Sequence, residues 1–161
     1  MPKSYIASIQ EQEDRDLSRA RCQLVKQQTW CKNQIHALLK KENLPPPVTD
    51  LFGKKGQLWL KEQQLSKAKQ LVIDEFLNLL KDVKKRIAVL EKEIHKRCLN
   101  NRKVEILKSI PGFGEITAFI LAVEIGNINR FPTGKKLSAY LGLVPSLYQS
   151  GKTKRQGSIT K

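Results

Sequence analysis

The stretch VEILKSIPGFGEITAFILAVEIG, Val104 to Gly126, predicts two helices joined by a tight turn. Pro111 cannot continue a helix, because it has no N–H and biases the preceding residue away from the α region. Gly112 and Gly114 can adopt positive φ without a side-chain clash. Glu115 then suits the positive end of a second helix. An apolar stripe at helical spacing follows, formed by Ile116, Phe119, Ile120, Val123 and Ile125.

The turn itself is a candidate phosphate-binding element. A glycine turn that opens a helix leaves several backbone N–H groups pointing outward, where a phosphate oxygen can be bound. The pattern resembles the helix-hairpin-helix of DNA-binding proteins. The alternative is an ordinary helical hairpin whose glycines only make the turn.

Charge is distributed unevenly along the 161 residues, whose formal net charge is +15. The last acidic residue is Glu124, and seven basic residues follow it: Arg130, Lys135, Lys136, Lys152, Lys154, Arg155 and Lys161. Unopposed positive charge indicates a polyanionic partner, most simply nucleic acid; a basic surface that only keeps the protein in solution is the alternative. Lys135 and Lys136 oppose the dipole of a predicted helix at 134–141, which favours a role in partner contacts.

Metal and membrane sites are not expected. Cys22, Cys31 and Cys98 are an odd number without metal-ligand spacing, so we expect reduced thiols, a cytoplasmic protein and no metal site in this chain. No apolar run approaches the length that a membrane span needs, and no signal peptide is recognisable.

Two long helices are predicted before the turn, at about 10–43 and 67–99, separated by a proline break at 44–47. The second helix carries a clean heptad seam: Ile73, Phe76, Leu80, Val83, Ile87, Leu90 and Ile94. The first carries a weaker one: Leu17, Leu24, Cys31 and Leu38, with Ala20 and Ile35 near companion positions. This pattern indicates a coiled coil whose partner is either the first helix, folded back antiparallel, or a second chain. The connector between them, 48–66, is expected to turn at 52–56 and then form a short helix in which Trp59 packs rather than stacks on a base.

The predicted fold is therefore all-α. Residues 1–102 form a long antiparallel coiled-coil arm, and residues 103–161 form a small helical domain with the helix-hairpin-helix and a basic tail. Ser150 is a candidate nucleophile in that tail, because nearby cations could stabilise charge on an attacked phosphodiester. The tail offers no His, Asp or Glu as a base, so the alternative is a disordered basic tail in which Ser150 has no special role.

Four ordered blocks carry a family resemblance: S-x-P-G-x-G at 109–114, E-I-G-x-I-x-R-F at 124–131, A-Y-x-G-L-x-P at 139–145, and S-G-K with G-x-I-T-K at 150–161. They resemble the C-terminal domain of bacterial DEDD-type transposases of insertion-sequence families 110, 116 and 902, and the Piv-like DNA invertases. A G-K-x-G-x-x-W-L segment at 53–60 also matches, so the resemblance covers nearly the whole chain.

The resemblance implies DNA transposition or recombination. It implies that Ser150 attacks the DNA backbone to form a phosphoserine link, and that a RuvC-like nuclease domain supplies acidic residues that bind divalent metal. A structured guide RNA is a further partner in such proteins. The implied nucleic-acid contacts are Gly112, Gly114, Lys135, Lys136, Lys152, Lys154 and Arg155. Lys152 replaces a family glycine.

Neither the nuclease domain nor the acidic tetrad is recognisable in this sequence, so we expect a truncated transposase that is inactive alone. It is a fragment, the product of a decayed gene copy, or a part that works only with another chain. The alternative function is a coiled-coil interaction or regulatory protein that forms a homo-oligomer or pairs with a full-length transposase.

Overall fold

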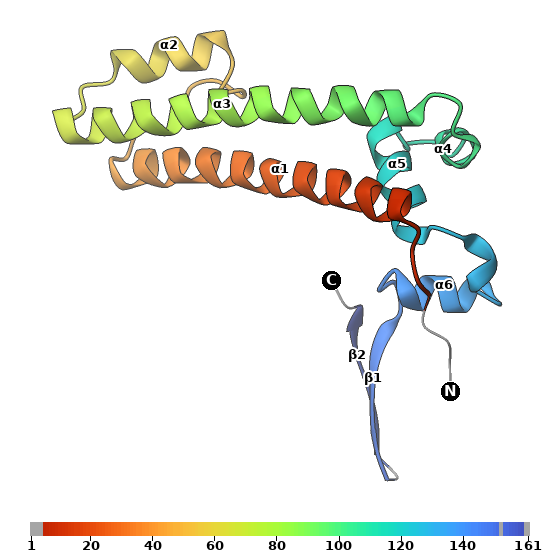
Figure 1. Ribbon diagram of the computed structural model, residues 1–161. Coiled ribbons are helices and arrows are strands. Elements are labelled where there is room, and N and C mark those ends of the chain that lie inside the picture. Colours follow the sequence, from red (N-terminus) through yellow and green to blue (C-terminus); the bar gives the residue numbers. More distant parts are fainter. Residues whose placement is uncertain (1–4, 152, 160–161) are drawn as a thin grey trace. The chain divides into compact units, whose positions relative to one another are not determined.

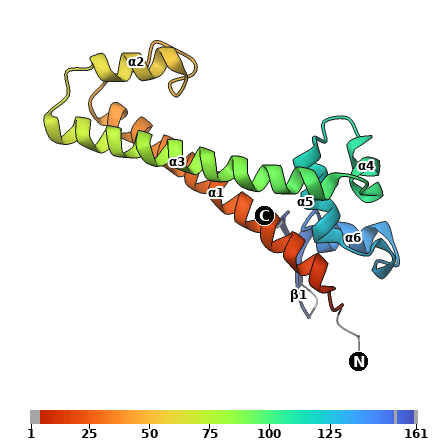
Figure 2. The ribbon, with the colours of Figure 1, turned by 45° about the horizontal axis from the view of Figure 1, so that its top comes forward.

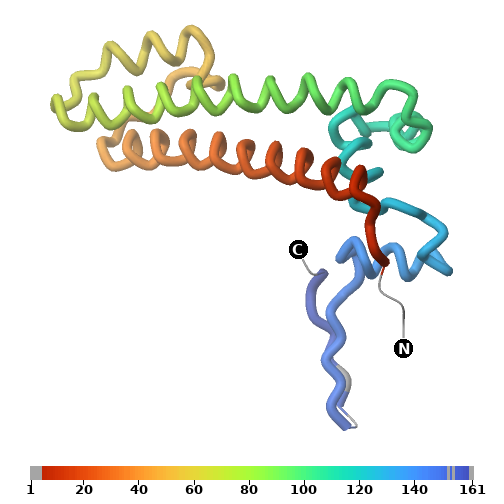
Figure 3. Tube along the Cα trace, viewed as in Figure 1, coloured from red at the N-terminus to blue at the C-terminus, as the bar shows by residue number. Residues whose placement is uncertain are grey.

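The computed structural model describes residues 5–151 and 153–159, and its elements can be followed along the chain in Figures 1 and 3. It divides into two compact units: a helical unit, Ser8–Glu124, and a C-terminal unit, Ile125–Lys161 together with Met1–Ala7. Each is described by itself. The boundary at residue 103, between a coiled-coil arm and a small helical domain, stays a prediction.

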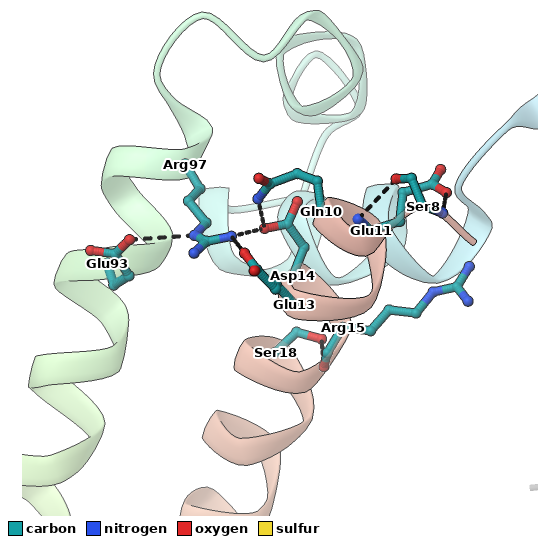
Figure 4. Close-up of polar contacts among 9 residues, drawn as sticks. All are labelled: Ser8, Gln10, Glu11, Glu13, Asp14, Arg15, Ser18, Glu93 and Arg97. Atoms are coloured by element: carbon teal, nitrogen blue, oxygen red, sulfur yellow. Dashed lines mark hydrogen bonds and ion pairs between the residues drawn. The ribbon is translucent and has the colours of Figure 1, made fainter.

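The helical unit is built on two long helices, α1 (Ile9–Lys41) and α3 (Lys67–Cys98), which lie side by side and antiparallel (Figures 1 and 2). Both were predicted from the sequence, and both are confirmed within two residues at each end. Ser8 begins α1 with a capping box: its hydroxyl accepts from Glu11 N at 3.2 Å, and its own N–H donates to the Glu11 carboxylate at 2.9 Å (Figure 4).

The helix-facing seam of α3 lies where the heptad pattern predicts. Its buried residues include Ile73, Leu80, Val83, Ile87 and Ile94.

On α1 the predicted seam is partly wrong. Leu39 is buried where Leu38 was expected, Ala20 is exposed, and Ser18 is buried. Ser18 and Leu39 are three heptads apart, so at both ends of the seam the buried position keeps a seven-residue spacing but lies one position later than predicted. Leu38 is partly buried beside it.

Two buried clusters occupy opposite ends of this helical pair. The first joins α1 and α3 to the connector and consists of Cys31, Ile35, Leu39, Leu51, Phe52, Leu60, Ile73 and Leu80. The second joins the pair to the two short helices that follow and consists of Ile94, Cys98, Val104, Ala118, Phe119, Ala122 and Val123. Ion pairs of Arg97 connect α1 and α3 at the end that carries the second cluster. Arg97 Nη1 lies 2.5 Å from Asp14 Oδ1, and Arg97 Nε lies 3.3 Å from Glu93 Oε1 (Figure 4).

The connector contains α2 (Lys54–Glu62), which begins inside the segment predicted as a turn at 52–56. Gly56 explains the difference, because it serves close packing inside the helix. A Cβ at this position would lie 2.2 Å from Leu51 O, so α2 rests directly on the backbone that precedes it. Leu60, fully buried, anchors the other end of α2 in the first cluster.

The C-terminal unit corrects the all-α prediction. After a 3-10 turn (Ile128–Arg130) and the predicted helix α6 (Gly134–Tyr140), the basic tail forms an antiparallel hairpin of β1 (Pro145–Ser150) and β2 (Thr153–Ile159). Its turn passes through Gly151 at φ 56°, a conformation that glycine adopts without strain. Tyr148, Thr153 and Ile159 have high strand propensity, and the density of serine, lysine and arginine around them hid that signal.

Gly56→Ala tests the packing of α2. We expect the free energy of unfolding to fall by about 1–3 kcal/mol, because the added methyl group meets rigid backbone. Denaturant unfolding followed by circular dichroism measures it. Gly114→Ala is the matched control in the same unit, since a Cβ there meets nothing within 4 Å; an equal loss in both variants would contradict the packing role of Gly56.

Candidate functional site

The glycine turn lies between α4 (Arg102–Lys108) and α5 (Glu115–Ile125). Asn101 starts α4, and its side chain accepts from the N–H groups of Lys103 and Val104 at 3.1 and 3.4 Å. The turn closes with a bond from Phe113 N to Ile110 O at 3.1 Å. Gly112 has φ 87°, as the sequence predicts; Gly114 does not adopt positive φ.

Backbone amides are available at the start of α5. Gly114 O accepts the first helical bond, from Ala118 N at 2.9 Å. Within residues 5–151 and 153–159, the N–H groups of Gly114, Glu115 and Ile116 have no hydrogen-bond acceptor. A Cβ built on Gly112 or Gly114 would meet no atom within 4 Å, so the surface over these amides is open. Such an arrangement suits an anionic oxygen.

Burial of α5 holds this turn at the surface. Phe119 is fully buried against Ile94 and Cys98 of α3 and Val104 of α4. Ala118 and Ala122, one turn apart and absent from the predicted stripe, are also buried, because small side chains let helices approach closely.

Two arginines of α1 hold the other end of α5. Arg15 Nε donates to Val123 O at 2.9 Å, which satisfies a carbonyl that the helix end leaves free. Arg19 forms a bidentate pair with the Glu124 carboxylate at 2.9 and 3.1 Å.

Glu115 connects three helices at the turn. Its Oε2 lies 2.8 Å from His95 Nδ1 of α3, and its Oε1 lies 3.8 Å from Lys108 Nζ of α4. The hydrogen bond to the His95 imidazole, aided by the charge of Lys108, holds the pKa of Glu115 below its ordinary value. The carboxylate therefore stays ionised and bound to its own neighbours.

In the C-terminal unit, Arg130 is the centre of an aromatic cluster. Its guanidinium lies 4.4–4.5 Å from the ring centroids of Tyr5, Phe131 and Tyr140, and its Nε donates to Ile125 O at 3.1 Å. From the sequence, Arg130 was only one of the seven basic residues that follow Glu124. Its contacts make it a structural residue, because cation–π contacts on three rings hold the guanidinium inside the unit. The aromatic residues that flank it are spread over 135 positions, so no local pattern indicates the cluster.

The remaining predicted cations lie on exposed elements. Thr133 caps α6, accepting from Lys136 N at 3.4 Å, and both Lys135 and Lys136 are exposed. Arg155 is exposed on β2. Lys152 lies outside the described residues. Lys154 is described only through its backbone, which pairs with Gln149.

Ser150, the candidate nucleophile, ends β1 and is exposed. It pairs with Thr153, and Tyr148 pairs with Arg155. Directly opposed residues of an antiparallel pair share one face, and so do alternate residues of a strand. Ser150 and Arg155 therefore lie on one face of the hairpin. The sequence after Glu124 contains no His, Asp or Glu, so this segment supplies no imidazole or carboxylate base to Ser150.

No group of three or more His, Cys, Asp or Glu side chains in the described part of the chain is placed to hold a metal ion. None of its helices is both long and apolar enough to cross a lipid bilayer.

Comparison with known proteins gives a consistent picture. Residues 104–161 match the family described as "Transposase IS116/IS110/IS902 family". A "Probable family 20 transposase" of Pseudomonas aeruginosa is 28% identical over 97% of this chain and 47% of its own length. The "Transposase for insertion sequence element IS1111A" of Coxiella burnetii is 27% identical over 89% of this chain and 40% of its own length. A "Pilin gene-inverting protein" of Moraxella bovis is 41% identical over 32% of this chain and 16% of its own length.

These matches support a relationship between this chain and the transposases of that family. The chain spans less than half the length of these relatives. No solved structure matches it significantly.

Glu115→Gln tests the link among the three helices. Because the pKa of Glu115 is lower in the folded state, its ionised form stabilises the fold above the ordinary glutamate pKa, and this contribution is lost as the pH falls through the depressed value. We expect the wild type to exceed the variant by up to about 1 kcal/mol at neutral pH. The difference should shrink below about pH 4.3. Thermal unfolding at a series of pH values measures it.

Glu75→Gln, which removes an exposed carboxylate of α3, is the control for the change in charge. A difference between wild type and Glu115→Gln that stays constant down to acidic pH would contradict the assignment.

Proposed function

We propose that this chain acts in DNA transposition as a nucleic-acid-binding part of a transposase, and that residues 103–161 provide the contacts. One observation carries the proposal: the family match begins at residue 104, two residues after α4 begins, and it covers both the open amides of the glycine turn and every basic residue after Glu124.

The turn is proposed to act as a helix-hairpin-helix. Gly114 supports this reading, because neither its backbone angle nor any neighbouring atom requires glycine there. A residue without a side chain at that place lets a sugar–phosphate backbone approach the amides of Gly114, Glu115 and Ile116. Buried residues position the turn, and neither packing nor backbone conformation requires glycine at position 114. This argues against the alternative of a hairpin whose glycines only make the turn.

Charge supports the second part of the interface. Of the candidates, Lys135, Lys136 and Arg155 are exposed, and no carboxylate in the sequence after Glu124 competes for them. Contacts of this kind are made to phosphates and fix position without reading sequence. Both DNA and a guide RNA present such phosphates, and DNA is the partner that a role in transposition requires.

Ser150 is proposed as the nucleophile of strand transfer. Its Oγ would attack a backbone phosphorus, forming a phosphoserine ester while one DNA oxygen leaves and takes up a proton. Arg155, on the same face of the hairpin as Ser150, would stabilise the charge on the attacked phosphate. Residues 125–161 contain no His, Asp or Glu, so we assign the base that takes the proton of Ser150 to another part of the assembly. Divalent metal would belong to the nuclease domain that the resemblance implies.

The antiparallel pair of α1 and α3 is proposed to be the coiled coil of the arm. Because α1 covers the buried seam of α3 within one chain, association with a second chain would use other positions. Exposed apolar side chains on α3, among them Val72, Leu79 and Val89, favour the second candidate function, pairing with a full-length transposase or a second copy.

The triple variant K135Q/K136Q/R155Q tests the basic interface. We expect weaker binding to all DNA duplexes regardless of sequence, and a salt dependence of log K that is shallower by about 2 to 3, because each lost phosphate contact removes about 0.9 from the slope. Fluorescence anisotropy at several salt concentrations measures both. The matched control, K26Q/K40Q/K92Q, removes three exposed lysines of α1 and α3. Equal losses in both variants would mean that overall charge, and not this region, determines binding.

Ser150→Ala tests the nucleophile. Because the chain is expected to be inactive alone, it is mixed with a full-length transposase of the family, with magnesium and with DNA that carries an activated leaving group. We expect the wild-type chain to form a covalent adduct, distinguished by its smaller mass and stable in denaturing gels, and Ser150→Ala to form none. Thr153→Val removes the hydroxyl of the residue paired with Ser150 and should keep the adduct. An adduct that survives in Ser150→Ala, or a wild type that forms no adduct, would contradict the assignment.

A further inference from the structure

A second basic surface lies far along the sequence from the family match, in the helical unit. A groove of about 810 Å³ runs between α2 and α3, which lie side by side (Figures 1 and 2). Four lysines line it: Lys61 of α2, and Lys81, Lys84 and Lys85 of α3. Lysines from two separate elements thus line one concave surface, whereas the lysines of a single solvated helix face share no common groove.

The walls of this groove are rigid. Leu60, the neighbour of Lys61, is fully buried in the same cluster as Ile73 and Leu80 of α3. At the other end of α2, the Gln57 side-chain amide donates to Phe52 O at 2.8 Å. The backbone positions from which these lysines extend are therefore fixed before any ligand binds, which lowers the entropic cost of binding.

Charge in the groove is largely uncompensated. Some basic residues elsewhere in the helical unit are paired at short range, as in Lys69 with Glu42 at 2.6 Å and Arg21 with Glu91 at 2.7 Å. Among the groove lysines, Lys85 lies 3.8 Å from Asp82, and the other three have no ion pair to a described residue. Asp74 is the one carboxylate in the lining, and it also accepts from the Gln70 amide at 3.2 Å.

The shape of the basic surface indicates an extended ligand. Lys81, Lys84 and Lys85 span one helical turn, about 6 Å along the axis of α3. Lys61 faces them across the groove, so the positive charge forms a track rather than a single point. The exposed amide of Asn78 adds a hydrogen-bond donor to the same track.

We propose that the groove between α2 and α3 binds a phosphodiester backbone, and that the arm thereby contributes a second nucleic-acid contact. This inference goes beyond the proposed function, which places its contacts after residue 102, and shares with it only the premise that the chain binds nucleic acid. The arm would then bind nucleic acid in addition to its proposed association with a second chain.

Lysine footprinting on the full wild-type chain tests the proposal. The chain is acetylated in the presence of a random-sequence DNA duplex, an RNA hairpin, or inorganic phosphate, and each lysine is quantified by mass spectrometry. We expect DNA or RNA to slow acetylation of Lys61, Lys81, Lys84 and Lys85, and the two polymer arms to show which backbone is preferred. Lys26, Lys40 and Lys92, exposed on the same helical pair, are the internal reference and should react at an unchanged rate.

Equal rates with and without either polymer would overturn the proposal. Equal protection by inorganic phosphate would also overturn it, since the groove would then be a site for a small anion.

The variant K81Q/K84Q/K85Q gives an independent measurement. We expect the salt dependence of log K to become shallower by about 2 to 3 relative to K26Q/K40Q/K92Q, with an unchanged helical circular dichroism signal. If this variant behaves as the control does while K135Q/K136Q/R155Q loses binding, the groove proposal fails and the proposed function stands. If only the groove variant loses binding, the proposed interface after residue 102 fails and the groove remains.

Discussion

Burial of α5 at the end of the helical pair is the constraint on which the rest of the helical unit depends. Phe119 is enclosed by α3 and α4, and the two alanines beside it let α5 approach closely. Arg15 and Arg19 of α1 then bind the C-terminal end of α5 through its carbonyls and Glu124. Packing fixes one face of α5 and ion pairing fixes its last turn, and its one exposed residue, Thr117, lies in the first turn. The open amides of the glycine turn are therefore a consequence of packing at residues distant from the turn.

The C-terminal unit is organised on a different principle. Among its described residues, Gly126 is the only one that is buried, so apolar burial contributes little to its stability. Arg130, held by three aromatic rings, takes the place of a hydrophobic core. A two-stranded hairpin is marginally stable in water, and the absence of carboxylates after Glu124 leaves its charge unbalanced. Both properties suit a segment whose free energy is lowered by a polyanionic partner.

Local patterns predicted the helices well. Heptad spacing located α3 and its buried residues, and Pro111 with the adjacent glycines located the turn between α4 and α5. These elements follow from the identity and spacing of neighbouring residues. Two errors came from tertiary packing. Gly56 lies inside a helix because its missing side chain permits contact with Leu51. At its two ends, Ser18 and Leu39, the buried seam of α1 lies one position later than the pattern predicts.

The site was less predictable than the helices. The basic residues and Ser150 could be picked out from composition and resemblance, but the β-hairpin that places Ser150 and Arg155 on one face was missed. The aromatic cluster of Arg130 and the lysine groove both depend on residues brought together from distant positions. Nothing in the spacing of Lys61 and Lys81 along the sequence indicates that they face each other.

The most direct test of the central claim, that this protein binds nucleic acid through its phosphate backbone, is the salt dependence of DNA binding by the unmodified chain. Affinity is measured for two duplexes of unrelated sequence over a range of salt concentrations. Contacts from three or more cations predict a slope of log K against log salt of roughly −3 or steeper, since each contributes about −0.9, and the same slope for both duplexes. A slope near zero would contradict the account.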